Sequence, residues 1–137
     1  MARERELHNV RFFPLQPLAR LPLILSAGDI HLVVQRREAA DLVMPSKLTN
    51  ILAAGRPSIA TVDPDTALYE VLNGHDCGIT TRPGNVDELV EGIVTLTRDV
   101  KTRQRLGRNA RRYAESYLDK DGILVRFENN LRELIEG

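Results

Sequence analysis

The residues best suited to chemistry lie in the stretch DLVMPSKLTNILAAGRPSIATV, at positions 41–62. Ser46 and Lys47 follow Pro45 at the point where an apolar run gives way to a helical pattern. The first turn of a helix has N–H groups without partners and a partial positive charge, which both favour an anion such as phosphate. A serine hydroxyl and a lysine cation add a donor and a full charge. The stretch therefore predicts an anion-binding helix start.

The same residues also suit an ordinary helix start. Serine is a favoured N-cap, and proline is common beside the first turn. At the far end, Gly55 suits a left-handed C-cap and Pro57 suits the start of a strand. On this local pattern alone, plain capping is the favoured interpretation. The anion site depends on where the rest of the fold places the helix.

Alternating strand and helix patterns must position this stretch. Short apolar runs predict strands at 9–13, 30–35, 57–62 and 77–81. Helical spacing predicts helices near 21–28, 46–54, 65–74 and 85–99, continuing through 101–118, and a last one at 121–137. Pro22 favours a start near Leu21 or a kink, and Asp65 or Thr66 can cap the third helix. The pattern predicts an α/β fold: one partial Rossmann-like domain with a four-stranded parallel sheet, helices on both faces and further C-terminal helices.

Ligands of open parallel sheets bind beyond the carboxyl ends of the strands. The loops after residues 13, 35, 62 and 80 all reach that edge. The loop after residue 35 is the longest and most polar of them, and it leads directly to Ser46. This placement makes the helix start at Ser46 a plausible anion site, beside the alternative of plain capping.

Other reactive residues form no recognisable constellation. His8, His31 and His75 lack metal-ligand spacing, and neither a Gly-x-Ser-x-Gly nor a phosphate-binding P-loop motif occurs. Cys77 is the single cysteine, which excludes an internal disulfide. We expect no metal.

The composition is that of a globular domain. The 137 residues are 42% hydrophobic and 28% charged, and 19 basic residues balance 19 acidic ones. Zero net charge, no Trp and few other aromatics argue against nucleic-acid binding. The charged start MARERELHNV has no signal-peptide core, and no apolar run is long enough to cross a membrane. We expect a cytoplasmic protein.

The run MPSKLTNILAAGRPSIA resembles the donor-binding segment of GT-B-type retaining glycosyltransferases, especially the colanic-acid and exopolysaccharide branch. NVRFFPLQPLARLPLILSAGDIHLVVQ is similar to the strand, helix and strand that precede that segment. RLGRNARRYAESYL is similar to a helix that follows it. The resemblance covers nearly all 137 residues.

The resemblance implies a site for a GDP- or UDP-linked sugar. The donor diphosphate would bind at Pro45, Ser46, Lys47 and Leu48, through backbone N–H groups. The sequence departs from the family pattern at two positions. Asn50 occupies the position at which many relatives hold the ribose with a Glu. Leu42 occupies the position at which a second Glu contacts the donor sugar. Glu38 or Asp41 could replace that second Glu, with a solvated loop charge as the equal alternative. The resemblance also implies that three residues contact the nucleotide base: Phe13, Pro14 and Leu15.

The resemblance further implies transfer of a hexose to a glycan or lipid-linked acceptor, without a cofactor and with catalytic residues unassigned. We expect one domain over residues 1–137, the carboxyl-terminal donor-binding part of a longer enzyme, without its N-terminal acceptor domain. Such a chain would be inactive alone and would expose a sheet edge suited to self-association. Five basic residues suit either a solvated helix face or peripheral contact with the inner face of the membrane: Arg98, Lys101, Arg105, Arg108 and Arg112.

A non-catalytic α/β module is the alternative, either a nucleotide sensor or a protein-interaction domain. A phosphoacceptor receiver is one form of it, and that form needs acidic residues at strand ends. Phe13 and Gln35 end the first two predicted strands, and Asp63 alone is not enough.

Overall fold

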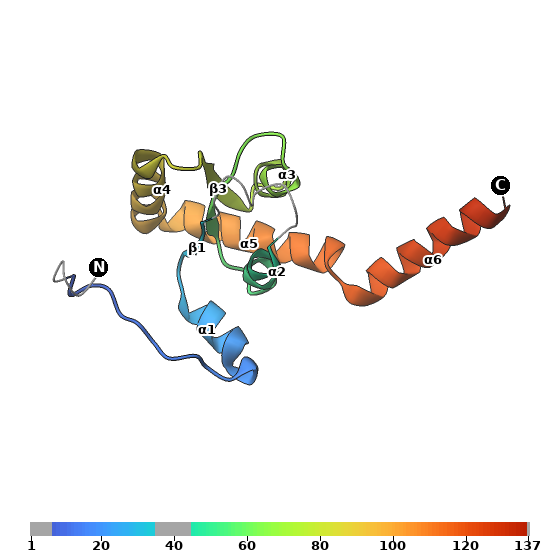
Figure 1. Cartoon of the computed structure of the whole chain (residues 1–137), viewed down its shortest axis with the longest axis horizontal. Helices are drawn as coiled ribbons and strands as arrows, with labels where there is room; N and C mark the ends of the chain where they lie inside the picture. The colour runs from blue at the N-terminus through green and yellow to red at the C-terminus, as the bar shows by residue number, and fades with distance from the viewer. Residues whose placement is uncertain (1–6, 35–44, 137) are drawn as a thin grey trace.

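In the computed structural model, which describes residues 7–34 and 45–136, a three-stranded parallel sheet forms the centre of the chain (Figure 1). The strands are β1 (His31–Val33), β2 (Ser58–Thr61) and β3 (Gly78–Thr81), in that spatial order. Ser58 lies opposite His31 on one side and opposite Gly78 on the other, so all three strands begin at one level. Their carboxyl ends therefore share one edge.

The predicted four-stranded sheet is wrong: residues 9–13 form no strand in the described part of the chain. The Phe12 and Phe13 side chains are each 78% exposed, and Figure 1 shows this segment running outside the body of the molecule. A strand exists only through pairing, and no neighbouring strand among the described residues meets this one. The three remaining strands and their parallel arrangement are confirmed.

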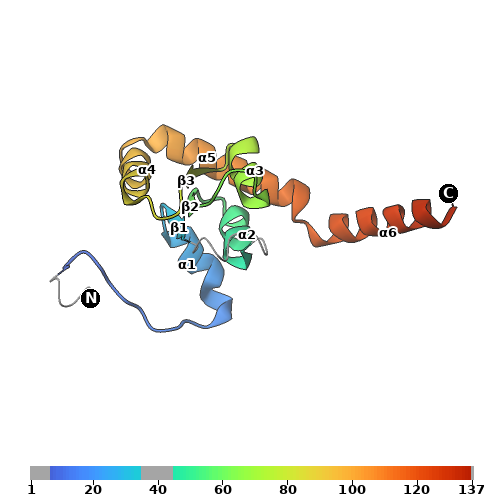
Figure 2. The same ribbon diagram turned by 45° about the horizontal axis from the view of Figure 1, so that its top comes forward.

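Helices cover both faces of the sheet, as predicted. α2 (Ser46–Ala53) and α3 (Ala67–Gly74) contribute to the hydrophobic cluster that includes Ala60. α4 (Val86–Arg98) contributes to the cluster around Ile59, which points to the opposite face because side chains alternate along a strand. Figure 2 shows α4 and the α2–α3 pair on either side of the strands. Both faces of β2 are therefore covered, and all four of its residues are buried.

Local signals set the helix boundaries. A 3-10 turn, η1 (Leu18–Arg20), precedes α1 (Leu21–Ala27), which begins at Leu21 as predicted, with Pro22 in its first turn. Thr66 is the N-cap of α3, accepting from the Tyr69 N–H at 3.2 Å. Gly55 follows α2 with φ +65°, which confirms the predicted left-handed position.

The long helical pattern after residue 85 divides into two helices at Asp99. This residue ends α4 and caps α5 (Val100–Tyr117), accepting from the N–H of Thr102 at 3.0 Å and from its hydroxyl at 2.8 Å. The backbone hydrogen bond from Thr102 is the main reason that the Asp99 pKa is lowered. α5 contributes to both clusters, with Leu106 on one side and Ala110 on the other.

The predicted last helix is present as α6 (Lys120–Glu136), and it projects away from the sheet (Figure 1). Five of its large apolar side chains are exposed: Ile123, Leu124, Phe127, Leu131 and Leu134.

Candidate functional site

The first turn of α2 lies beside the carboxyl end of β1. Leu48, Ile51 and Leu52 are buried in the core and fix the face that α2 turns toward the sheet. The Lys47 Nζ donates to the backbone carbonyl of Leu32 at 2.7 Å. The structure therefore brings the predicted anion-binding turn to the predicted edge of the sheet.

The amides of this turn differ in what they can donate. Pro45 has no N–H, and the Leu48 N–H already donates to the Pro45 carbonyl at 2.8 Å. The N–H groups of Ser46 and Lys47 belong to the first turn, where the helix itself supplies no acceptor. The first turn also carries no acidic side chain, so its partial positive charge is not neutralised locally. Two amides are thus suited to an incoming anion.

The Lys47 ammonium is positioned rather than free to swing. His31 and Val33 pair with β2, and the His31 N–H donates to the Pro57 carbonyl at 3.1 Å. Because backbone groups alternate along a strand, the Leu32 carbonyl faces the outer edge of β1. Lys47 satisfies that carbonyl with one of its three N–H bonds and keeps two for a ligand.

Asn50 lies one turn after Ser46 on the same exposed face of α2. Its side chain is therefore on the same side of the helix as the Ser46 hydroxyl. Whether it meets a ribose stays a prediction.

The other predicted donor contacts are not gathered at this turn. Glu38 and Asp41, with Leu42, lie outside the described residues. Phe13, Pro14 and Leu15 are exposed in the segment that precedes η1, which both views show outside the sheet and its covering helices (Figures 1 and 2). Their roles stay predictions.

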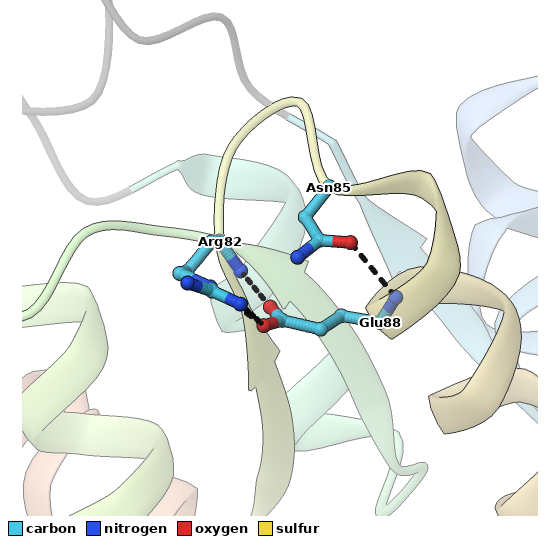
Figure 3. Close-up of polar contacts among 3 residues, drawn as sticks. All are labelled: Arg82, Asn85 and Glu88. Carbon is cyan, nitrogen blue, oxygen red and sulfur yellow. Dashed lines mark hydrogen bonds and ion pairs between the residues drawn. The ribbon is translucent and has the colours of Figure 1, made fainter.

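A second feature of the same edge was not predicted from the sequence. After β3, the Glu88 carboxylate accepts two hydrogen bonds from Arg82, one from its backbone N–H at 2.8 Å and one from its side-chain Nε at 2.6 Å (Figure 3). Asn85 caps α4 by accepting from the Glu88 N–H at 3.1 Å. The hydrogen bond from the Arg82 side chain is the main cause that lowers the Glu88 pKa. The Asn-x-x-Glu spacing was a usable signal, since it is typical of a capping box.

This arrangement fixes the β3–α4 turn beside an open depression of about 530 Å³ that residues 82–87 line. Gly84, in the turn at Pro83-Gly84, has φ +79°, a conformation that favours glycine. The Arg82 guanidinium is directed to Glu88, so it is not available as a free cation at the edge.

Asp63 follows β2 at the same edge. Its carbonyl accepts from the Thr66 hydroxyl at 3.0 Å, and Asp65 adopts φ +71°, a conformation that Asp tolerates better than most residues. This loop is therefore a tight connection into α3.

Residues 7–34 and 45–136 contain no group of three or more His, Cys, Asp or Glu that could hold a metal ion. No helix in those ranges combines the length and apolar character needed to cross a membrane.

Comparison with known proteins places this geometry in context. Residues 1–113 match a family model described as "Glycosyl transferases group 1". Over 133 residues the chain is 43% identical to WcaI of Escherichia coli (strain K12), provisionally named a colanic acid biosynthesis glycosyl transferase. That alignment covers 96% of this chain and 32% of WcaI.

Two solved structures share the fold. Sucrose-phosphate synthase (tll1590) from Thermosynechococcus elongatus superposes with a TM-score of 0.79 at 19% identity, over 98% of this chain and 33% of that one. Anabaena Alr3699/HepE, solved in complex with UDP-glucose, superposes with a TM-score of 0.75 at 22% identity. That superposition covers 96% of this chain and 35% of HepE. The chain thus spans about a third of the length of each of these relatives.

Proposed function

Because this chain belongs to the group 1 family of glycosyl transferases, we propose that it is the donor-binding part of a hexosyltransferase. Its 43% identity to a relative named for colanic acid biosynthesis supports a role in making exopolysaccharide or another cell-surface polysaccharide. The acceptor in this proposal is a glycan or a lipid-linked sugar. The donor is a GDP- or UDP-linked sugar, and the fold shared with HepE, solved with UDP-glucose, supports a donor of that class.

One observation carries the proposal: the first turn of α2 opens at the carboxyl edge of the sheet, with Lys47 fixed beside it by the Leu32 carbonyl. The Ser46 and Lys47 amides, the Ser46 hydroxyl and the Lys47 ammonium make a donor set for a diphosphate. Asn50 lies one turn further along the same face of α2, and we assign it to the ribose that joins the diphosphate to the base.

This donor set suits the chemistry of sugar transfer. The bond between the sugar and the diphosphate breaks, and negative charge grows on the leaving nucleotide diphosphate. The acceptor hydroxyl bonds to the sugar and gives up its proton, which the leaving diphosphate can accept. Fixed N–H groups and a positioned ammonium stabilise that charge as it develops. The chain's own contribution is thus to hold the donor and to stabilise its leaving group.

The acceptor side of the reaction is part of the proposal as well. The relatives are about three times as long as this chain, and we assign acceptor binding to the part of them that it does not match. Transfer needs both substrates held in one cleft, because much of the rate comes from their positioning.

The alternative of a non-catalytic receiver-like module finds no support at this edge. Of the described residues at the strand ends, Asp63 is the acidic one, and its loop is a connection into α3 rather than an acidic cluster. Family membership also favours the transferase.

The test is to map nucleotide binding on the ¹⁵N-labelled chain. Titration with UDP, GDP and their glucose and mannose conjugates should shift the amide signals of Ser46, Lys47 and Asn50. AMP, with one phosphate, is the matched control and should bind more weakly. Shifts that leave 46–50 unchanged would contradict the proposed site.

A further inference from the structure

A separate pocket lies at the opposite edge of the sheet. It encloses about 420 Å³, and residues 54–57, which join α2 to β2, form one of its walls, while α5 forms another. α2 has eight residues, so about 12 Å of helix separates its first turn from this pocket. None of the donor-site residues that the structure describes lines it.

The pocket is strongly basic. Arg56, Arg103, Arg108 and Arg111 line it, and Asp29 is its one acidic lining residue. Glu115 pairs with Arg111 and offsets a further charge. The formal sum of four arginines less Asp29 and Glu115 is +2, in a chain whose overall net charge is zero.

Three of these arginines are held in place by backbone carbonyls at helix ends. The Arg103 Nη1 donates to the Leu96 carbonyl at 2.6 Å, and the Arg111 Nη1 donates to the Ala53 carbonyl at 2.6 Å. Arg56 donates in the same way to the last turn of α1. A guanidinium has five N–H groups, so each anchored arginine keeps donors for a ligand. Arg108 has no hydrogen-bond or ion-pair partner among the residues that the structure describes.

The floor between these arginines is nearly bare backbone. A Cβ added to Gly107 would lie 2.5 Å from the Gly55 carbonyl oxygen, so α5 and the α2–β2 turn are in direct backbone contact. Gly55 also has φ +65°, which a side chain would strain. The two glycines leave the space between the guanidinium groups open.

We propose that this pocket binds a phosphate-bearing small molecule, which is a different site from the one proposed for the nucleotide sugar. Planar guanidinium groups match the oxygens of phosphate in pairs. The volume of about 420 Å³ falls within the ordinary range for small-molecule pockets, about 300–1,000 Å³, and exceeds what a bare phosphate needs. The phosphate is either free, as in a phosphate monoester, or the headgroup of a lipid.

Helix capping explains the anchors, but it leaves Arg108 without a role. Arginine near a helix C-terminus stabilises the last carbonyls, which accounts for Arg103 and Arg111. Capping alone does not require a fourth arginine on the same open floor. Arg108 therefore separates the two interpretations.

The experiment titrates inorganic phosphate and glycerol 3-phosphate into the ¹⁵N-labelled chain at constant ionic strength. Saturable shifts are expected at the Gly55 and Gly107 amides. Arg108→Ala should weaken binding about tenfold, the loss of one charge-assisted hydrogen bond. Arg112→Ala, an exposed arginine on the same helix that does not line this pocket, is the matched control and should bind normally.

A second arm identifies the source of the phosphate. Co-sedimentation with phosphatidylcholine vesicles that contain phosphatidic acid, abolished by Arg108→Ala, would identify a lipid headgroup. Phosphate binding without vesicle binding would identify a free ligand. The proposal is overturned if neither arm depends on Arg108, or if Arg112→Ala has the same effect. Failure of UDP to bind at Ser46 would not overturn the basic-pocket proposal, because that proposal is read from the amide signals of Gly55 and Gly107.

Discussion

Lys47 and Glu88 are the charged side chains that organise the carboxyl edge, and each does so by bonding to backbone. Lys47 satisfies the outward carbonyl of Leu32, and Glu88 accepts from the Arg82 N–H. Both contacts fix a loop or a helix start without closing it to a ligand. At the residue scale, the proposed site is a set of positioned hydrogen-bond donors. Substituting one residue should therefore change one contact without disturbing the others.

Lys47→Ala should weaken UDP or GDP binding by about 1–2 kcal/mol, roughly 5- to 30-fold in Kd, which is the scale of one charge-assisted contact. Isothermal titration calorimetry measures the change. Lys101→Ala, an exposed lysine on α5, is the matched control and should leave Kd unchanged. Equal Kd values for Lys47→Ala and the unmodified chain would remove Lys47 from the donor site.

Arg82→Ala should raise the Glu88 pKa, because the Arg82 side chain is the main cause of its lowering. A lowered carboxylate pKa stabilises the fold above the ordinary Glu range and loses that effect as the pH falls through the folded-state value. The β3–α4 turn should therefore loosen in acid earlier in the variant than in the unmodified chain. NMR titration of the Glu88 side chain tests the shift, and an unmoved pKa would contradict it.

At the scale of elements, close backbone contact between α2 and α5 organises the edge opposite the proposed donor site. Gly55 and Gly107 meet there, and Arg111 reaches across to the Ala53 carbonyl from 58 residues away. The end of α2 is therefore fixed by α5, while its beginning is fixed by β1. A helix held at both ends presents its first turn with little freedom.

Gly55→Val should destabilise the fold by about 1–3 kcal/mol, because a β-branched residue is strained at φ +65°. The new Cβ would also lie 3.3 Å from the Arg111 Cβ. Gly74→Ala is the control, since a Cβ there meets nothing within 4 Å and Ala favours a helix. Urea denaturation compares them, and equal midpoints for Gly55→Val and the unmodified chain would count against this assignment.

At the scale of the whole molecule, two features of the described part of the chain are suited to contact with a second chain: a strand edge and an apolar helix face. The outer edge of β1 pairs with no other described strand, although Lys47 bonds to its outward Leu32 carbonyl. α6 projects away with its apolar residues exposed (Figure 1). Exposed edges and apolar faces tend to pair with a second chain.

We expect the isolated chain to self-associate through the β1 edge. Val34, which is 62% exposed just after β1, offers a site for a charge that opposes edge pairing. Val34→Lys should lower the association that sedimentation velocity measures as concentration rises. Val86→Lys places the same charge on an exposed residue of α4 and should change nothing. A monodisperse monomer at every concentration would exclude the edge as an interface.

The isolated chain should also transfer no sugar. Donor and acceptor must be held in one cleft, and this chain spans about a third of the relatives it matches. The assay supplies UDP- and GDP-sugars with a lipid-linked acceptor extract and follows nucleotide release. Acceptor-dependent turnover would show that acceptor binding lies within these residues.

The sequence by itself determined what depends on neighbouring residues. Helical spacing located the start of α2 at Ser46 and of α1 at Leu21, although Ser46 is the first helical residue rather than the N-cap, which is Pro45. The left-handed turn at Gly55 followed from the glycine after the last apolar position. Continuous apolar runs located the three strands of the parallel sheet. Helix capping and hydrophobic periodicity act over a few residues, so both can be read along the chain.

Only the tertiary structure decided what depends on distant partners. Residues 9–13 have the composition of a strand, yet no described strand pairs with them. The acceptor for Lys47 lies 15 residues away, and the carbonyls that anchor Arg56 and Arg111 lie 30 and 58 residues away. Strand pairing and hydrogen-bond choice depend on which segments meet in space, and no local pattern encodes that meeting. For the same reason, the basic pocket appeared only once α2 and α5 were brought together.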